Sequence, residues 1–594
     1  MLEEIDPSTI EDGPTRQLVI KLLNLLDKAL HQIDLLKAEN QALRDENNRL
    51  KGEQAKPEFK PLTPNKNLAA PKPTTLPPKK EPKGAKKANL VLTLTQKLTL
   101  DRQNLPKDVQ FKGYQSVIVQ EVIFRPEVIL FQKEKFYSPS TQMTYLAPLP
   151  PGFTGQFGPG LKALVLQLYY QANLSEPKLL ELLRTFGFQI SAAQISNWLI
   201  HDHQALFEAE KHQIVKAGLA SSSWQHFDHT STRAMGKTQA CHVVCNPYYT
   251  AFTTLPQRDR LSVLKVLLGG QPPTFCYNQQ AQKLLVDLGL PHKWTKHLKS
   301  LEVGRLYSHS EIQTWLDTQA KGLGHNGRKW VFDALAIAAY HTQSGWPVVK
   351  TLVCDDAPVF NLISEQLALC WIHEGRHYTK LEPRLAYHRK LLADFQGRFW
   401  RFYDQLLDYT QKPTSSKAEW LSTQFDELFK AGGEYEGLDA RKAKTRAKRE
   451  QLLLILEQPY LPLHNNPAEL GARQRVRKRD VSLAAASQAG LRGWDALQSV
   501  VATAKKLGVN VYHYLLDRVS GKNEMISLAQ AITNKATHSG SEPNLYYPSE
   551  RSRERSHQAR TKHKTSASLS PPKSSRAKPK VVGRSVSLSL VGST

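Results

Sequence analysis

The stretch SWQHFDHTSTRAMGKTQACHVVCNPYYTAFTTL, residues 223–255, decides the fold that the sequence predicts. It contains three short runs rich in apolar and β-branched residues, SWQHFDHT, QACHVVCN and YYTAFTTL, with turn residues between them. Runs of this kind predict three consecutive strands. The segment DRLSVLKVLL (259–268) predicts a helix, and VVKTLVCD (348–355) predicts a further strand that ends in an acid pair. Together these elements indicate a core of mixed α/β class.

Three carboxylates stand out by their positions around this core. Asp228 lies at the end of the first strand, Asp355 closes the later strand, and Glu469 lies just inside a helix in LHNNPAELGARQRVRKRD (463–480). Acids from the ends of separate strands and from a helix can converge at one edge of a mixed sheet. Carboxylate oxygens are the ligands that Mg²⁺ prefers. Two such ions can drive an in-line displacement at phosphorus, so the pattern points to a phosphoryl-transfer site.

Each acid also has a purely structural interpretation. Asp228 could be a turn acid, and Asp355 with Asp356 could be a loop pair in which one residue caps a helix. Asn466, Pro467 and Glu469 could form an N-cap, N1 and N3 capping box. From the residues alone, the catalytic and the structural interpretations both stay open.

The core is flanked by segments of different character. Residues 149–205 are predicted to be helical: one helix is capped by Ser175 and ends before Gly187, and Ser191 with Gln194 forms a capping box for the next. Two helices joined by a short turn containing glycine resemble a helix-turn-helix. The expected division is 1–51 leader and coiled coil, 52–90 Pro/Lys-rich linker, 91–148 β-rich domain, 149–205 helical region, 206–490 catalytic core with insertions near 270–345 and 376–458, 491–533 C-terminal helices, and 534–594 disordered basic tail.

Residues 14–51 read as one long helix with a heptad repeat. Val19, Leu26 and Ile33 fall at a positions, and Leu22 and Leu36 fall at d positions. Such a seam predicts a coiled coil with a second chain, and the asparagines at later a positions favour a parallel dimer in fixed register. The alternative is a helix that packs on its own protein.

The overall charge points to a polyanionic partner. The 594 residues include 80 Lys and Arg against 54 Asp and Glu, a net charge of +26. Nucleic acid is the first candidate for such a partner. The five cysteines form no CxxC pair, which favours a reducing compartment. No uncharged apolar run approaches the roughly 20 residues of a membrane span, and the expected location is therefore the cytoplasm, in association with the nucleoid.

Three blocks of the chain resemble the insertion-sequence transposases of the IS66 group, a family with a DDE catalytic domain. The block FDHT (227–230) is similar to the motif around the family's first acid, and CWIHEGR (370–376) is similar to its C-W-x-H-x-R-R motif. The third block, HNNPAEL (464–470), is similar to the motif around the third acid and precedes a basic run, as in the family. The resemblance runs over roughly 150–490.

The resemblance implies an RNase H-like core and an enzyme that cuts and joins DNA at transposon ends. It implies that Asp228, Asp355 and Glu469 hold Mg²⁺ or Mn²⁺. Thr230, His373 and Asn466 are candidates for supporting roles. The residues expected to meet DNA phosphates are Arg473, Arg475, Arg477, Lys478 and Arg479. The expected partners are terminal inverted repeats and target DNA, a second or further copy of the chain, and accessory transposition proteins. A catalytically inactive, transposase-derived dimeric DNA-binding protein is the alternative.

The sequence departs from the family pattern in three places. Family members carry a Cys-rich zinc element ahead of the helical region, whereas here no cysteine precedes Cys241. His229 stands where the family has Glu, and Leu470 stands where it has Arg. The clusters around Cys241 and Cys370 have too few ligands for a structural zinc site, which needs four.

Overall fold

The computed structural model describes residues 5–50, 94–98, 114–117, 119, 124–153 and 155–538. The chain divides into two compact units, Met1–Asn47 with Val122–Leu545, and Asn48–Glu121 with Tyr546–Thr594. All the elements below lie in the first unit, apart from the last residues of the N-terminal helix. The predicted linker 52–90 and all of the predicted tail beyond residue 538 fall outside the described residues.

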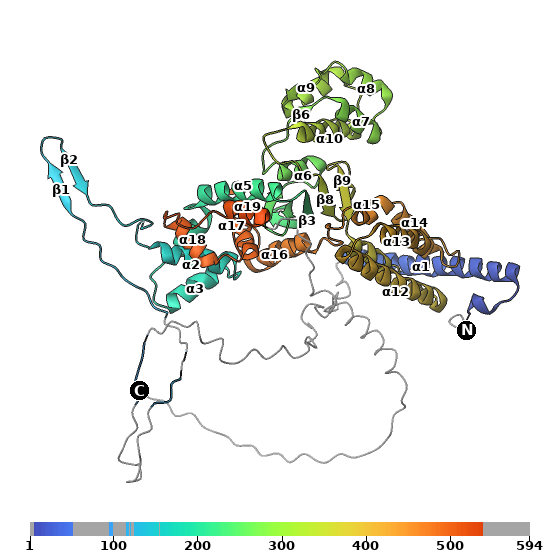
Figure 1. Ribbon diagram of the computed structural model, residues 1–594, viewed down its shortest axis with the longest axis horizontal. Coiled ribbons are helices and arrows are strands. Elements are labelled where there is room, and N and C mark those ends of the chain that lie inside the picture. Colours follow the sequence, from blue (N-terminus) through green and yellow to red (C-terminus); the bar gives the residue numbers. More distant parts are fainter. Residues whose placement is uncertain are drawn as a thin grey trace, which may run out of the picture. The chain divides into compact units, whose positions relative to one another are not determined.

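A five-stranded mixed sheet forms the centre of this unit (Figure 1). Its strands are β3 (Trp224–Ala234), β4 (Lys237–Cys245), β5 (Thr250–Leu255), β8 (Thr351–Cys354) and β9 (Gln366–Leu369), in the order β5-β4-β3-β8-β9. The pairs β3–β4 and β4–β5 are antiparallel, whereas β3–β8 and β8–β9 are parallel. The four strands predicted from sequence are all present. The short strand β9 was not predicted.

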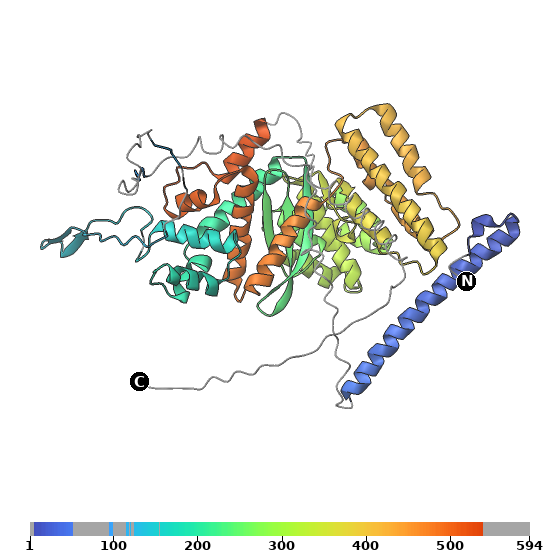
Figure 2. The ribbon, with the colours of Figure 1, turned by 90° about the horizontal axis from the view of Figure 1, so that it is seen from below.

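Helices cover both faces of the sheet. On one face, Cys241, Val243 and Phe252 pack against Ala472 of α16 (Asn466–Ser482) and Ala502 of α17 (Gln488–Leu507). Figure 2 shows α16 and α17 beside the strands. The alternate residues Phe227 and Val244 belong to the main apolar core. That core also contains residues of α6 (Arg260–Leu267) and α10 (His325–Thr342). The period-two alternation of the strands therefore divides their side chains between two apolar clusters.

The outer edge of β5 is closed by side chains of α17. Asp495, Ser499 and Thr503 follow one another at four-residue spacing and therefore share one face of the helix. They accept hydrogen bonds from the backbone N–H groups of Thr254, Phe252 and Thr250, at 2.6, 2.9 and 3.2 Å respectively. An edge strand whose N–H groups are occupied in this way cannot pair with another chain.

The region before the sheet is helical and extends beyond the predicted limit of residue 205, because its last helix continues to Ala220. It consists of α2 (Pro159–Tyr170), α3 (Glu176–Thr185), α4 (Ala192–Ile200) and α5 (Gln204–Ala220), and α18 (Val511–Val519) and α19 (Leu528–His538) pack against α2 and α5. Gly187 adopts a φ of +88° after α3, which ends the helix. The Ser191 side chain accepts a hydrogen bond from the N–H of Gln194, so Ser191 is the N-cap of α4 as predicted. Because α19 continues to His538, the C-terminal helices run beyond the predicted limit of residue 533.

Two helical segments separate elements of the core, one between β5 and β8 and one between β9 and α16. The first contains β6 (Phe275–Cys276), α7 (Gln279–Asp287), α8 (His292–Leu298), β7 (Leu306–Tyr307) and α9 (His309–Gln319), and leads into α10. The second contains α11 (Trp371–Thr379), α12 (Ala386–Gln411), α13 (Ser415–Leu428), α14 (Glu436–Arg446) and α15 (Arg449–Leu453). Both insertions are mainly helical, as predicted.

The N-terminal helix α1 (Gly13–Leu50) packs on its own protein in its first half. Leu23 is 4% exposed and contacts Leu385 and Tyr387 at the start of α12, together with Val19 and Leu26. Asp27 accepts hydrogen bonds from the N–H groups of residues 384 and 385, so it caps α12. In this half of α1 the buried face differs from the predicted a/d seam. It is formed by residues at a and e positions, and the side chain of Leu22, at a d position, is 54% exposed.

Three further features complete the fold. Within the predicted β-rich domain 91–148, the described residues form one antiparallel hairpin of β1 (Lys135–Ser138) and β2 (Met143–Leu146). All five cysteines are buried free thiols. Among the described residues, every helix is too short or too polar to cross a membrane.

Candidate functional site

Asp228 and Asp355 lie at matching positions on adjacent strands. The parallel register pairs Gln225 with Leu352 and His226 with Val353. Continuing it by two residues places Asp228 opposite Asp355, just beyond the end of β8. Adjacent strands are about 4.8 Å apart, and residues at the same level of parallel strands project to the same face. The two carboxylates therefore belong to the same edge and the same face of the sheet.

Glu469 reaches this edge because α16 lies very close to the sheet. A Cβ atom on Gly471 would stand 2.7 Å from Cγ1 of Val243, so this close packing requires a glycine. Val243 is the antiparallel partner of Asp228 on β4, which fixes the face on which α16 lies. Glu469, two residues before Gly471, is 9% exposed. The third acid thus comes from the helix that covers the face of the first.

Asn465, the residue before α16, ties the helix to strand β3. Its side chain is fully buried, its Nδ2 donates to the carbonyl oxygen of Phe227 at 2.7 Å, and its Oδ1 lies 3.0 Å from Nδ1 of His226. Its backbone N–H donates to Sγ of Cys370 at 3.2 Å. Asn465 therefore links β3, the start of α11 and the start of α16. The sequence predicted a supporting role for Asn466 instead. The same Asn-Asn-Pro motif would have identified Asn465 if its first asparagine, rather than its second, had been taken as the N-cap.

The capping-box interpretation of Glu469 is wrong. The N-cap of α16 is Asn465 rather than Asn466, and no side-chain hydrogen bond caps this helix. The Glu469 carboxylate instead faces cations: Oε2 lies 3.1 Å from Arg376 and 3.7 Å from Arg473, and Oε1 lies 3.6 Å from Nδ1 of His373. The Glu469 carboxylate is therefore held by Arg376, Arg473 and His373 and does not cap the helix.

The charges of the three acids act on one another. Burial is the main cause that raises the pKa of Asp228 to about 7; the negative charges of Asp355 and Glu469 contribute to this rise, and the hydrogen bond from the N–H of His229 and the charge of Arg376 oppose it. Like charges have this effect only at short range. The three acids predicted from separate parts of the sequence are therefore brought together.

The residues present fit a divalent cation of the hard, oxygen-binding kind. Oε1 of Glu469 is buried and has no hydrogen-bond partner among the described residues, which is costly for a carboxylate that holds no cation. The pKa of Asp228 is raised beside two further acids, and a bound cation would stabilise the charged form of this carboxyl. Asp228, Asp355 and Glu469 do not form a group with one oxygen each within 4.8 Å, so they do not surround a single small volume.

Two other groups of potential ligands lie nearby, and neither suits a hard cation such as Mg²⁺. Cys370, His373 and Glu469 come within 4.8 Å of one another, but the buried thiol of Cys370 is a soft ligand that such a cation does not prefer. In the second group, Glu374 and Asp356 are both bound by Lys448, and Asp356 also lies 3.3 Å from His377. These acids already have cationic partners.

The basic residues after Glu469 divide into two kinds. Arg473 and Arg477 are exposed, and Arg479 is half-buried and donates to the carbonyl of Ser231. Arg475 is fully buried in an ion pair with Asp495, and Lys478 is fully buried. Because the Lys478 ammonium lies over the Tyr169 ring and burial lowers its pKa to about 7, this residue is part of the interior. The predicted phosphate contacts of Arg475 and Lys478 therefore need correction.

The remaining predicted supporting residues lie near the acids. Thr230 is two residues after Asp228 and faces the same side of β3. His373 lies beside Glu469, and Arg376 Nη1 is 3.1 Å from its Nε2. Asn466 is half-buried in the first turn of α16. Arg376 was not predicted as a site residue, although it is the arginine of the CWIHEGR block.

Comparison with known proteins relates part of the chain to transposases. Residues 154–276 match the model of the family described as "Transposase IS66 family". The match spans α2 to β6 and includes Asp228. A protein of Sinorhizobium fredii (strain NBRC 101917 / NGR234), "Uncharacterized protein y4jO", is 27% identical over 332 residues, 54% of this chain and 100% of that protein. No solved structure matches.

Proposed function

We propose that this protein is a DDE transposase that cuts and joins DNA at transposon ends by metal-dependent phosphoryl transfer. The observation that carries the proposal is geometric: the parallel register sets Asp228 opposite Asp355, and the close packing of α16 on β4 brings Glu469 to the same face of the sheet. The family domain at residues 154–276 supports a transposase role. The mixed sheet with acids at adjacent strand ends supports an RNase H-like core, which the resemblance implies.

In this proposal each part of the site has a separate task. Asp228, Asp355 and Glu469 would hold Mg²⁺ or Mn²⁺. When bound, these ions supply activation of the attacking water or 3′-hydroxyl and stabilisation of the leaving oxygen. The Arg376 side chain is 43% exposed beside Glu469, so its guanidinium can bind a phosphate oxygen at the same edge. Arg473, on the exposed side of α16 one turn after Glu469, extends this positive surface along the DNA backbone.

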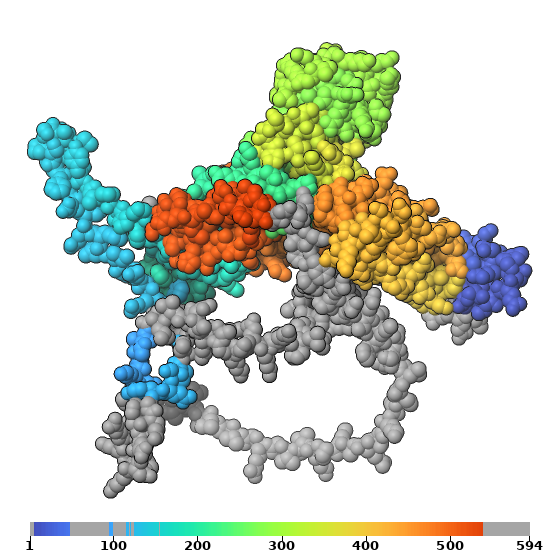
Figure 3. Space-filling view, viewed as in Figure 1, coloured from blue at the N-terminus to red at the C-terminus, as the bar shows by residue number. Residues whose placement is uncertain are grey.

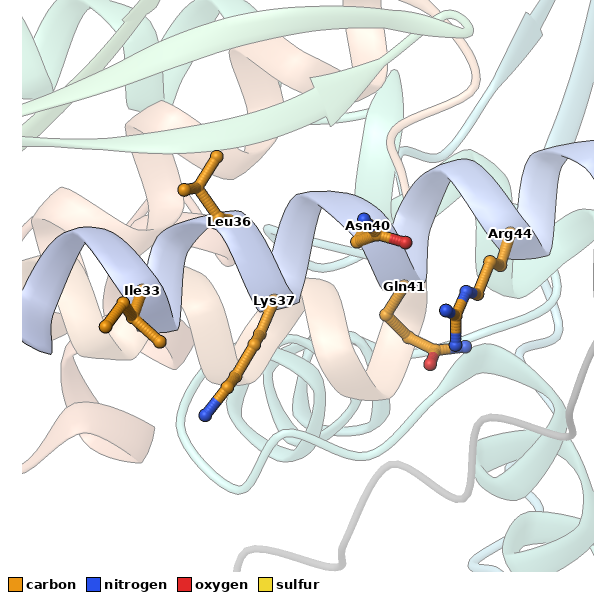
Figure 4. Close-up of a pocket in the computed structure, with 6 residues that line it drawn as sticks. All are labelled: Ile33, Leu36, Lys37, Asn40, Gln41 and Arg44. Atoms are coloured by element: carbon orange, nitrogen blue, oxygen red, sulfur yellow. The ribbon is translucent and has the colours of Figure 1, made fainter.

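The free half of α1 supports self-association of the protein. Ile33, Leu36 and Leu43 are 44%, 63% and 64% exposed, and an open pocket of about 480 Å³ runs along this half beside Asn40 (Figure 4). Exposed apolar residues at heptad spacing are stabilised by a partner helix, and an asparagine at an a position sets its register. A second copy of α1 is the partner that satisfies both.

The catalytic proposal is tested by replacing each acid with its amide. Asp228→Asn, Asp355→Asn and Glu469→Gln should each lower Mg²⁺-dependent cleavage of end-containing DNA on the order of 100-fold or more, the loss typical of a removed electrostatic group, with DNA binding largely unchanged. Asp356→Asn is the matched control, because Asp356 is bound by Lys448 and His377. If two of the three variants cut like the wild type, the assignment is wrong. If the wild type binds transposon ends without cutting them, the alternative of an inactive DNA-binding protein is correct.

A further inference from the structure

The first insertion carries lysines whose charge is not neutralised within the fold. Three of its acids are paired with arginines: Glu311 with Arg305, Asp317 with Arg328, and Asp333 with Arg260. The lysines are different. Among the residues that the structure describes, none of them has an ion-pair partner: Lys283, Lys293, Lys296, Lys299, Lys321 and Lys329. The insertion therefore presents a net positive charge to solvent.

Several of these lysines gather around the short helix α8. Leu298 is 1% exposed and belongs to the main core, and Trp294 is a half-buried side chain packed against that core. These two residues, four positions apart, form the inner side of α8. Lys293, Lys296 and Lys299 are exposed and three positions apart, so they follow one another along the outer side. Figure 3 shows the surface of the first insertion, which carries α8, in light green.

The aromatic side chains fix this basic surface to the rest of the insertion. The Trp294 ring lies 3.4 Å from the position of a Cβ atom on Gly322, which brings the neighbouring Lys321 close to α8. Nε1 of Trp315 donates to Oγ of Ser300 at 3.0 Å, which anchors the chain directly after the helix. The Lys293 ammonium lies 5.2 Å from the centroid of the Trp294 ring. The lysines therefore extend from a packed support rather than from a loose loop.

Most of the cations in the most basic run of the second insertion have acidic partners. In 441–449, Arg441 and Lys448 bind Glu374, Arg449 binds Asp426, and Lys442 lies beside Asp439. Lys444 and Arg446 are exposed and have no ion-pair partner among the described residues. The number of basic residues in a run thus does not measure the positive charge that it leaves unpaired: four of the six cations of this run are paired, whereas, within the same described part of the chain, none of the four lysines around α8 is.

We propose that Lys293, Lys296, Lys299 and Lys321 bind the phosphate backbone of duplex DNA. This rests on the proposed function, since DNA is then the substrate that the chain must hold. Three lysines at three-residue spacing cover about 9 Å of helix length. Each strand of duplex DNA carries one phosphate per about 3.4 Å of the helix axis, so such a row meets two or three phosphates of one strand at once. Lysine is a point charge without directional base recognition, and the surface therefore contributes affinity rather than sequence preference.

The test compares three variants of the full-length protein on a fluorescein-labelled duplex of random sequence. Lys293→Ala/Lys296→Ala/Lys299→Ala should weaken binding about ten-fold and lower the slope of log K against log salt by about two to three units, roughly one per lost contact. Lys293→Arg/Lys296→Arg/Lys299→Arg keeps the charge and should bind like the wild type. Lys412→Ala/Lys430→Ala/Lys444→Ala removes the same charge from exposed sites of the second insertion and should change both quantities much less.

Each outcome either supports the proposal or overturns it. An unchanged affinity and slope for the α8 alanine variant overturns it, and so does an equal loss in the control from the second insertion. Failure of the arginine variant to bind also overturns it, because charge would then not be the cause. Cleavage is measured separately on the same proteins. A selective loss of binding without any metal-dependent cutting by the wild type would leave this DNA surface in place and reject the catalytic proposal.

Discussion

Replacement of Asn465 by alanine tests whether one buried side chain positions the third acid. Asn465 donates to the Phe227 carbonyl and contacts His226 Nδ1, at 2.7 and 3.0 Å. Because the amide nitrogen is used as a donor, Oδ1 must accept, so Nδ1 of His226 carries the proton. Burial lowers the pKa of His226 well below its ordinary value, which is consistent with a neutral ring that donates from Nδ1.

The expected loss of stability follows from these two bonds. The Asn465→Ala change leaves the Phe227 carbonyl and the His226 N–H without partners in a site that is fully buried. An unsatisfied buried polar group costs about 1 to 3 kcal/mol. The variant should therefore lose about 2 to 5 kcal/mol of unfolding free energy. Asn465→Asp keeps the volume but turns a carboxylate oxygen toward the carbonyl, so it should be no more stable than the alanine variant.

Two measurements follow the consequence from packing to chemistry. Urea unfolding, followed by tryptophan fluorescence, gives the stability change, with Trp224 on the same strand as His226. Cleavage at saturating DNA should fall more than DNA affinity, because Glu469 lies one turn after Asn465 and loses its position. Asn466→Ala is the matched control and should stay within about 0.5 kcal/mol of the wild type. Equal stability of Asn465→Ala and Asn466→Ala would refute the positioning role.

Three further predictions concern packing, pH and assembly. Gly471→Ala should cost about 1 to 3 kcal/mol by pushing α16 from the sheet, and should slow cleavage, measured as above. Burial raises the pKa of Glu210 from 4.5 to about 7, so stability should fall by about 3 kcal/mol as pH rises from 4.5 through 7, and Glu210→Gln should remove that dependence in pH-resolved unfolding. Leu36→Asp should dissociate the dimer in sedimentation experiments, whereas Leu23→Ala should lower the unfolding free energy of the monomer by about 2 to 5 kcal/mol.

The sheet and its acids could be predicted because their signals are local. Alternation within 223–255 indicated β3, β4 and β5, and an apolar run ending in acids indicated β8. Acids at the carboxyl ends of parallel strands lie at the same edge of a sheet, so their position could be predicted from the direction of the chain in each strand. The four-residue β9 escaped because its run, QLAL, is too short to distinguish from the helix start that follows it. The N-cap of α16 was displaced by one position because both Asn465 and Asn466 satisfy the capping preference.

Features that depend on tertiary partners could not be predicted. The seam of α1 reads equally well as a coiled coil or as a helix on its own protein, because periodicity defines an apolar face and not its occupant. The answer differs along the helix: Leu23 is covered by α12, whereas Leu36 is exposed. Local sequence carries no record of residues 385 and 387, which lie far along the chain.

The basic residues of α16 and α8 show most clearly that tertiary partners, and not local sequence, decide which charges are exposed. Arg475 and Lys478 stand in the run that the sequence marks as the DNA-binding segment, yet both are enclosed, one by Asp495 and one by aromatic rings. Lys293 and Lys296 stand in a segment that the sequence analysis treated only as an insertion, and both are exposed without an ion-pair partner among the described residues. A buried cation that already has its partners gains little from a phosphate, whereas an exposed one releases counterions on binding. Pairing in the folded protein, and not the number of basic residues in a run, decides which lysines and arginines are free to meet DNA.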